Sequence, residues 1–111
     1  MIKISVMYPN VSGARFDHEY YRDKHMPLVQ QLLGESCSYY TIDRGLSGSD
    51  AGSAPAYVAM CHIFSRSMEI YINEMERSGK DILADIANYT DLKPVIQVSD
   101  VVIGYPFSNA I

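Results

Sequence analysis

The 111-residue chain has no Trp, only two Cys and no long apolar run. No stretch approaches the roughly 20 apolar residues of a membrane span, and the start, MIKISVMYPN, lacks the apolar core and cleavage site of a signal peptide. We therefore expect a cytoplasmic protein with no membrane partner. Cys37 and Cys61 form neither a CxxC motif nor a zinc-site spacing, so we expect them to be buried or free thiols.

Positive charge is also scarce, since nine Lys and Arg residues stand against 13 Asp and Glu, for a formal net charge of -4. The basic residues are scattered singly from Lys3 to Lys93, so no patch can track a phosphate backbone and we expect no nucleic-acid partner. No glycine-rich phosphate loop follows a predicted strand, and the three histidines have no metal-ligand spacing. We therefore expect no cofactor and no bound metal.

What the sequence does contain is typical of an ordinary globular protein. With 48% hydrophobic residues, its length fits one domain spanning residues 1–111. Nine Tyr against three Phe mean that most of the large aromatic side chains carry a hydroxyl that needs a partner or water. This surplus of tyrosine indicates an interior lined in part by polar groups.

Periodicity predicts a first strand and a first helix. Apolar and polar residues alternate over 2–8, as in a half-buried strand. Asp17 is placed to cap a helix that begins near His18 and ends at Gly34, with Phe16 packing on Tyr21. Pro27 lies near the middle of this helix and predicts a kink or break over 24–27. The stripe expected to face the sheet contains Tyr21, His25, Leu28, Val29 and Leu32.

The second half of the chain predicts three further strands and a second helical region. The strands are expected over 36–46, 56–64 and 94–103, with a loop over 47–55 between the first two. Ser65 or Ser67 is expected to cap a helix that runs to Gly79, and Asp81 to start a short further helix. The resulting order βαββαβ predicts an α+β, ferredoxin-like fold with a four-stranded antiparallel sheet.

Both faces of the predicted sheet carry large apolar side chains. In the third strand, for example, Met60 and Phe64 alternate with Cys61 and Ile63. Helices on one side of a four-stranded sheet leave its other side exposed to water, and an apolar patch there requires a cover. We expect a second copy of the chain to supply it, giving a homodimeric α+β barrel in which each ligand pocket lies between one copy's sheet and helices.

Several segments together resemble one known family. They are Arg15-Phe16-Asp17, Tyr20-Tyr21, Lys24-His25-Met26-Pro27-Leu28, Tyr57-Val58-Ala59-Met60, Asp85-Ile86 and Asn88-Tyr89-Thr90-Asp91. The chain thereby resembles, over nearly its whole length, the EthD-like family of dimeric α+β barrel proteins. The resemblance implies the ferredoxin-like dimer and a place among barrels that include methylmuconolactone isomerases, polyketide cyclases and cofactor-free monooxygenases. It fixes the fold better than the reaction.

His25 is the leading candidate for chemistry. It lies on the expected sheet-facing stripe, beside Pro27, and titrates near neutrality, so that it can move a proton. The alternative is a histidine hydrogen-bonded to a carbonyl that the proline leaves free. In the lactone isomerases to which this family is similar, the corresponding histidine acts with a tyrosine of the second strand, which here implies Tyr39 or Tyr40. Adjacent residues of a strand point to opposite faces, and we prefer Tyr39 for the pocket because Tyr40 shares a face with Ile42 and Leu46.

Other polar residues are candidates for substrate binding, each with a structural alternative. His62 is a reserve base or a satisfied interior or interface histidine, and Asp85 either orients His25 or a ligand or faces solvent. We expect the remaining contacts with substrate from Tyr21, Tyr40 and Tyr89.

These observations lead to one functional hypothesis and two alternatives. The first is an enzyme that binds a small, largely apolar aromatic, quinone-like or lactone compound, in which His25 and Tyr39 catalyse isomerisation or cyclisation by proton transfer without a cofactor. The second is a non-catalytic binding or accessory protein for a hydrophobic metabolite or a neighbouring monooxygenase. The third is a cofactor-free monooxygenase.

Overall fold

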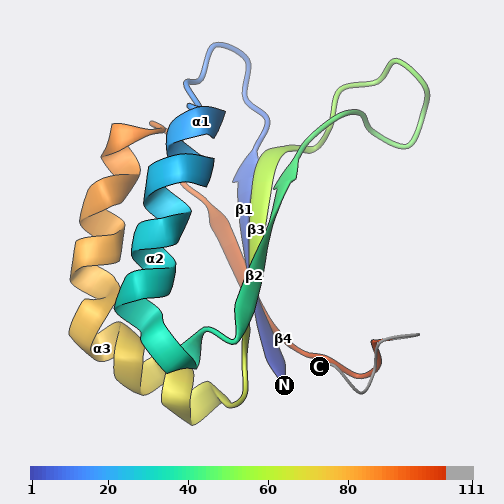
Figure 1. Cartoon of the computed structure of the whole chain (residues 1–111). Coiled ribbons are helices and arrows are strands. Elements are labelled where there is room, and N and C mark those ends of the chain that lie inside the picture. Colours follow the sequence, from blue (N-terminus) through green and yellow to red (C-terminus); the bar gives the residue numbers. More distant parts are fainter. Residues whose placement is uncertain (105–111) are drawn as a thin grey trace.

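The computed structural model describes residues 1–104 and consists of a four-stranded sheet with helices on one face (Figure 1). Residues 105–111 of the predicted domain lie outside the described part. The strands are β1 (Ile2–Pro9), β2 (Tyr39–Arg44), β3 (Tyr57–Ser65) and β4 (Val95–Asp100). They pair antiparallel in the order β2-β3-β1-β4. The predicted α+β, ferredoxin-like βαββαβ fold is therefore confirmed.

The first helical region begins as the sequence predicts. Asp17 caps α1 (His18–Tyr20) by accepting a hydrogen bond from the backbone N–H of Tyr20 at 3.1 Å. Phe16 packs edge-on against Tyr21, with ring centroids 5.1 Å apart, and so fixes the angle at which the chain enters the helix. The region ends at Gly34, whose φ of 55° is a conformation that glycine adopts without strain.

Pro27 is accommodated by a widening of this helical region and not by a break. Residues Tyr21–His25 form a π-helical segment, η1, between α1 and α2 (Met26–Leu33). The backbone N–H of Met26 donates to the carbonyl of Tyr21, five residues earlier. A π-helical turn frees the proline from the tighter spacing in which its ring meets a carbonyl of the preceding turn. The ribbon accordingly continues through α1 and α2 (Figure 1).

This widening changes which side chains of α2 face the sheet. Met26, Val29 and Leu33 are buried, whereas Leu28 and Leu32 are only half-buried. The predicted stripe therefore holds for Tyr21, His25 and Val29 and is wrong for Leu28 and Leu32. The prediction assumed a regular helix, whereas the π-helical segment contains one extra residue and changes which positions after it face the sheet.

The second helical region is one continuous helix, α3 (Met68–Asp85), which corrects the predicted interruption at Gly79. Ser67 caps it by accepting from the backbone N–H of Ile70 at 3.2 Å. Gly79 is buried within the helix, and next to it the Ser78 hydroxyl donates to the carbonyl of Leu32 in α2 at 3.3 Å. A single glycine lowers helix propensity by only about 1 kcal/mol, and the packing of the rest of α3 outweighs this cost.

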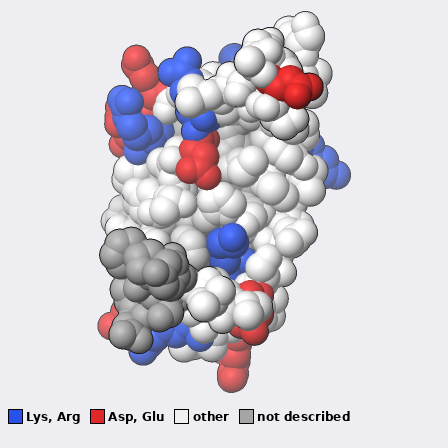
Figure 2. Space-filling view, turned by 90° about the vertical axis from the view of Figure 1, so that its right-hand side faces the viewer, with Lys and Arg blue, Asp and Glu red and all other residues white. Residues whose placement is uncertain are grey.

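Strand register divides the sheet into a covered face and an outer face. Ile4 lies opposite Ile63, and Val6 opposite Cys61, on the face that the helices cover. Ser5 and Met7, the alternate residues of β1, lie on the outer face opposite His62 and Met60. Figure 2 shows the outer face, most of which is made of uncharged side chains.

β2 and β4 are shorter than predicted, since residues 34–36 form a 3₁₀ turn (η2, Gly34–Ser36) and β4 ends at Asp100.

None of the helices within residues 1–104 combines the length and the apolar character that crossing a membrane requires.

Candidate functional site

A histidine and a carboxylate meet where the first helical region lies against the C-terminus of α3. His25 is the last residue of the π-helical segment, and Asp85 is the last residue of α3. The Nδ1 atom of His25 lies 2.8 Å from Oδ2 of Asp85, and their side chains are only 5% and 14% exposed. Burial protects this pair from the screening by water that weakens ion pairs and hydrogen bonds at a surface.

Two more side chains fix the carboxylate of Asp85. The hydroxyl of Tyr20 donates to Oδ1 at 2.7 Å, and the amide nitrogen of Asn88 donates to the same oxygen at 2.8 Å. Asn88 ends the 3₁₀ turn η3 (Ile86–Asn88), which follows α3 directly. Because both carboxylate oxygens have partners, Asp85 holds the ring of His25 in one orientation.

The turn after η3 is tied to the segment that precedes α1. The hydroxyl of Thr90 donates to the carbonyl of Arg15 at 2.6 Å, and the backbone N–H of Arg15 donates to a carboxylate oxygen of Asp91 at 3.1 Å. The backbone N–H of Asp17 donates to the carbonyl of Tyr89 at 2.8 Å. These bonds bring the N-terminus of the first helical region, and with it Tyr20 and His25, to the C-terminus of α3.

Burial and hydrogen bonding determine the protonation of the pair. Burial lowers the pKa of His25, and Asp85 only partly opposes this shift. Desolvation acts to raise the pKa of Asp85, but the hydrogen bonds from His25, Tyr20 and Asn88 outweigh it and the pKa is lowered. At neutral pH the pair is therefore a neutral imidazole and a carboxylate, with the imidazole proton on Nδ1. The lone pair on Nε2 is left to accept a proton from another molecule.

His25 lines an apolar cavity between the covered face of the sheet and the helices. The cavity leaves about 80 Å³ in which the centre of a water-sized sphere can move, and the space open to a ligand's atoms is correspondingly larger. Val6, Val29 and Ile63 contribute to its walls, and Leu83 and Ile96, both largely exposed, lie where it borders solvent. Such a site suits a small, largely apolar molecule with few polar atoms.

Two buried tyrosines flank the imidazole, and a third, Tyr8, packs against both of them. Tyr89 and Tyr21 lie on His25 with ring centroids 4.4 and 5.6 Å away, and the rings of Tyr21 and His25 are stacked at 12°. The hydroxyls of Tyr8 and Tyr89 are hydrogen-bonded to each other, and burial raises the pKa of Tyr8 to about 12, so it stays protonated. The hydroxyl of Tyr21 is different, because no hydrogen-bond partner for it is found within residues 1–104.

Comparison with known proteins places this chain in a family. The family model of the EthD domain matches residues 9–93. The chain belongs to the EthD family. An EthD-like protein from Ralstonia eutropha JMP134 has 52% sequence identity, with 96% of each chain covered and a TM-score of 0.92. The expected family assignment is thereby confirmed.

Two more distant structures share the fold of this EthD-family chain. An ethyl tert-butyl ether D (EthD) family protein from Bacillus halodurans C-125 is 20% identical, with 90% of this chain and 97% of that chain covered and a TM-score of 0.69. A protein from Arabidopsis thaliana is 12% identical, with 90% and 94% covered and a TM-score of 0.66. No protein with a curated description matches the chain. The comparisons establish the family and the fold, and the chemistry has to be argued from the site.

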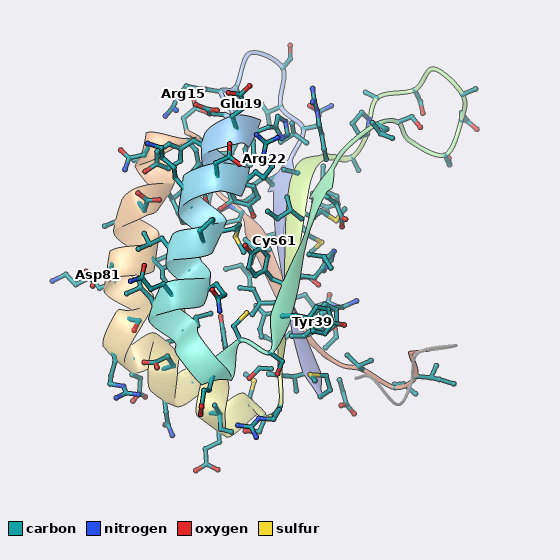
Figure 3. The ribbon with its side chains drawn as sticks, in the orientation of Figure 1. Arg15, Glu19, Arg22, Tyr39, Cys61 and Asp81 are labelled. Atoms are coloured by element: carbon teal, nitrogen blue, oxygen red, sulfur yellow. The ribbon has the colours of Figure 1, made fainter. Side chains whose placement is uncertain are left out.

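The prediction that Tyr39 of this EthD-family chain faces the pocket is wrong. Tyr39 lies opposite Phe64 on the outer face, where the two rings stack with centroids 4.3 Å apart, and it is 40% exposed. Figure 3 shows Tyr39 pointing away from the helices, whereas Cys61 lies between helices and sheet. The alternative, Tyr40, lies opposite Ile63 and packs against the core on the covered face.

His62 also lies on the outer face, away from His25. Its Nδ1 atom is 2.8 Å from the hydroxyl of Ser5, and its Nε2 atom is 3.2 Å from a carboxylate oxygen of Asp43. It thus links β1, β3 and β2 across the sheet. The sequence leaves open whether His62 serves as a reserve base or as a satisfied histidine, and the structure gives both ring nitrogens partners outside the cavity.

The sequence alone does not place Tyr20 and Asn88 beside Asp85. It predicts Tyr20 only as a residue on the first helix and Asn88 only as part of a turn. The spacing of Asp85 and Asn88, three residues apart at the end of a helix, is a signal that could have found this contact, since such residues share a helix face.

Within residues 1–104, no group of three or more His, Cys, Asp or Glu side chains is placed to hold a metal ion.

Proposed function

We propose that this EthD-family protein is a cofactor-independent enzyme that isomerises or cyclises a small, largely apolar organic molecule by moving a proton. The observation that carries the proposal is the buried His25 at the wall of an apolar cavity, held in place by its bond to Asp85. A neutral imidazole whose second nitrogen is fixed by a carboxylate is well suited to act as a general base near neutral pH. Aromatic, quinone-like and lactone compounds are the substrate classes to test.

Each residue has a defined part in the proposed reaction. Nε2 of His25 accepts a proton from a carbon of the substrate, and the same imidazolium returns it to another position. Asp85 is a positioning residue, because it acts through His25 by orienting the ring and stabilising its positive charge. Tyr20 and Asn88 in turn hold Asp85.

Solvent-deuterium exchange tests this proposal on model compounds, so the natural substrate does not have to be identified first. The protein is incubated in D2O with a panel of unsaturated lactones and aromatic ketones, and proton NMR follows deuterium entering at the carbon beside the carbonyl. We expect exchange by the wild-type protein that falls by at least about 100-fold in His25→Gln. Tyr39→Phe, which changes a hydroxyl on the outer face, is the matched control and is expected to exchange at the wild-type rate.

Three results would contradict the proposal. Equal exchange rates in the wild type and in His25→Gln would remove His25 from the mechanism. Retention of a ligand with no exchange for any compound would favour the non-catalytic binding role. Consumption of dioxygen together with the substrate, measured with an oxygen electrode, would favour a cofactor-free monooxygenase.

We also propose that the working unit is a homodimer in which a second copy covers the outer face of the sheet. The support is the apolar character of that face, where Tyr39 stacks on Phe64 and Val95 is 48% exposed. Patches of this kind are rare on monomers unless they bind a partner.

Two free, buried cysteines, Cys37 and Cys61, support a location in the reducing cytoplasm.

A further inference from the structure

The hydroxyl of Tyr21 is a buried donor that the protein leaves without a partner. Tyr21 is 1% exposed, and its hydroxyl is the buried side-chain polar atom within residues 1–104 for which no hydrogen bond is found. Buried hydroxyls are almost always hydrogen-bonded, because burying one without a partner is unfavourable. A donor of this kind therefore needs an explanation.

The neighbours of this hydroxyl do not supply a good acceptor. Tyr8 and Tyr89 bond to each other, and the aromatic contacts of Tyr21 include Phe16. The thiol of Cys61 is a polar neighbour that interacts with the hydroxyl of Tyr21, but this contact does not meet the distance and angle of a full hydrogen bond. Burial raises the pKa of Cys61 to about 11, so it is a neutral thiol and a weak acceptor.

Tyr21 lines the same cavity as His25. The two residues are four apart in the π-helical segment, their rings are stacked, and both belong to the cavity wall. Most of the remaining wall is apolar, with residues such as Val29, Ile63 and Ile82. A ligand that enters the cavity can therefore supply the acceptor that the apolar wall lacks.

From this geometry we infer that Tyr21 donates a hydrogen bond to the carbonyl oxygen of the ligand while His25 faces the adjacent carbon. The inference rests on the proposed function and deepens it, because it restricts the substrate class to small apolar carbonyl compounds with an acidic C–H bond beside the carbonyl. It also replaces Tyr39 as the tyrosine of the site.

The two residues divide the reaction between them. Nε2 of His25 accepts the proton from the carbon, the electron pair of that C–H bond forms a carbon–carbon double bond, and the carbonyl π pair moves onto oxygen. The resulting enolate oxygen accepts a stronger hydrogen bond from Tyr21 than the carbonyl did. The imidazolium, paired with Asp85, then returns the proton to carbon, so that no oxidant or reductant is consumed.

A pair of probes that differ only in the acceptor tests the inference by binding alone. Acetophenone carries a carbonyl oxygen, and α-methylstyrene has nearly the same shape with a CH2 group in its place. The dissociation constants of both probes are measured by NMR titration for the wild-type protein and for Tyr21→Phe. We expect the dissociation constant of acetophenone to rise about tenfold in Tyr21→Phe and that of α-methylstyrene to stay within about twofold.

A spectroscopic measurement separates a direct hydrogen bond from a change in cavity shape. The carbonyl stretch of bound acetophenone is expected at lower frequency in the wild type than in Tyr21→Phe, because a donor weakens the C=O bond. Tyr39→Phe is the matched control, since it removes the hydroxyl of a tyrosine on the outer face, away from the cavity. It is expected to leave both the affinities and the stretch as in the wild type.

The outcomes distinguish this inference from the proposed function. If Tyr21→Phe leaves the ratio of the two dissociation constants and the carbonyl stretch unchanged, the inference is wrong, even where exchange still depends on His25. Failure of the wild type to bind acetophenone would also overturn it, as would an equal loss of acetophenone in the control Tyr39→Phe. If Tyr21→Phe selectively loses acetophenone while no compound exchanges deuterium, the carbonyl site stands and the proposed reaction is wrong.

Discussion

Removing one oxygen atom from Tyr21 and from Tyr8 should change stability in opposite directions. Both residues are 1% exposed, their rings contact each other with centroids 5.9 Å apart, and both substitutions are Tyr→Phe. They differ in their partners, since the hydroxyl of Tyr8 is bonded to that of Tyr89 and the hydroxyl of Tyr21 has none within residues 1–104. Hydrogen bonding alone therefore decides the sign of each effect.

The size of each effect follows from the cost of a buried donor without a partner, about 1–3 kcal/mol. Tyr21→Phe removes such a donor from the folded state. The space left by one oxygen, on the order of 10 Å³, costs only about 0.2 kcal/mol at about 24 cal/mol per Å³. We therefore expect Tyr21→Phe to raise the free energy of unfolding by about 1 kcal/mol or more, or roughly 4 °C in Tm.

Tyr8→Phe should instead lower the free energy of unfolding by about 1–3 kcal/mol, because it leaves the fully buried hydroxyl of Tyr89 without its partner. Both variants and the wild type are unfolded in urea without ligand and followed by circular dichroism. All three are compared at one protein concentration, since an assembly of copies would make stability depend on concentration.

One result would refute this reasoning. If Tyr21→Phe is destabilised by as much as Tyr8→Phe, the hydroxyl of Tyr21 has a partner in the free protein, such as water or Cys61. The cavity would then need no acceptor from a ligand.

Three further predictions concern the ionisable pair and the outer face. Burial lowers the pKa of His25 in the folded state, so the unfolded chain binds the extra proton first as the pH falls below about 6.5. The free energy of unfolding therefore decreases in that range. His25→Gln should flatten this part of the curve when urea unfolding is measured as a function of pH. Asp85→Asn should lower the free energy of unfolding by about 2 kcal/mol. Because Asp85 raises the pKa of His25, the same substitution should move the acid limb of the pH profile of deuterium exchange to lower pH. An acid limb that does not move would contradict the positioning role of Asp85. Phe64→Asp places a charge beside Tyr39 on the outer face and should halve the molar mass found by light scattering, whereas a wild-type protein that is already monomeric would exclude the homodimer.

The elements and their order could be predicted because each has a local signal. Alternation marks β1, Asp17 and Ser67 mark helix starts, and Gly34 marks a helix end. The interruption predicted at Gly79 failed because one glycine costs a helix only about 1 kcal/mol, which the packing of a long amphipathic helix against the rest of the fold outweighs.

The candidate site was predictable in its histidine and less so in its partners. Proximity to Pro27 and the stripe of the first helix single out His25. The choice between Tyr39 and Tyr40 could not be made from β2 alone, because alternation separates two faces without showing which one the helices cover. Only the pairing of Tyr40 with Ile63 of β3 decides it. The bond between His25 and Asp85 joins residues 60 apart in sequence, so it depends on the whole fold.

The π-helical segment has a consequence for how this site tolerates changes in chain length. A π-helical turn is equivalent to an α-helix with one extra residue inserted. The wide turn absorbs this residue, so the parts of the helix before and after it keep their relative orientation. Deleting the exposed Asp23 would close the segment into a regular helix in which Tyr21 and His25, then three residues apart, still share a face. The ring of Pro27 would lose the wider spacing, so the cost of the deletion is expected at the proline and not at the two functional groups.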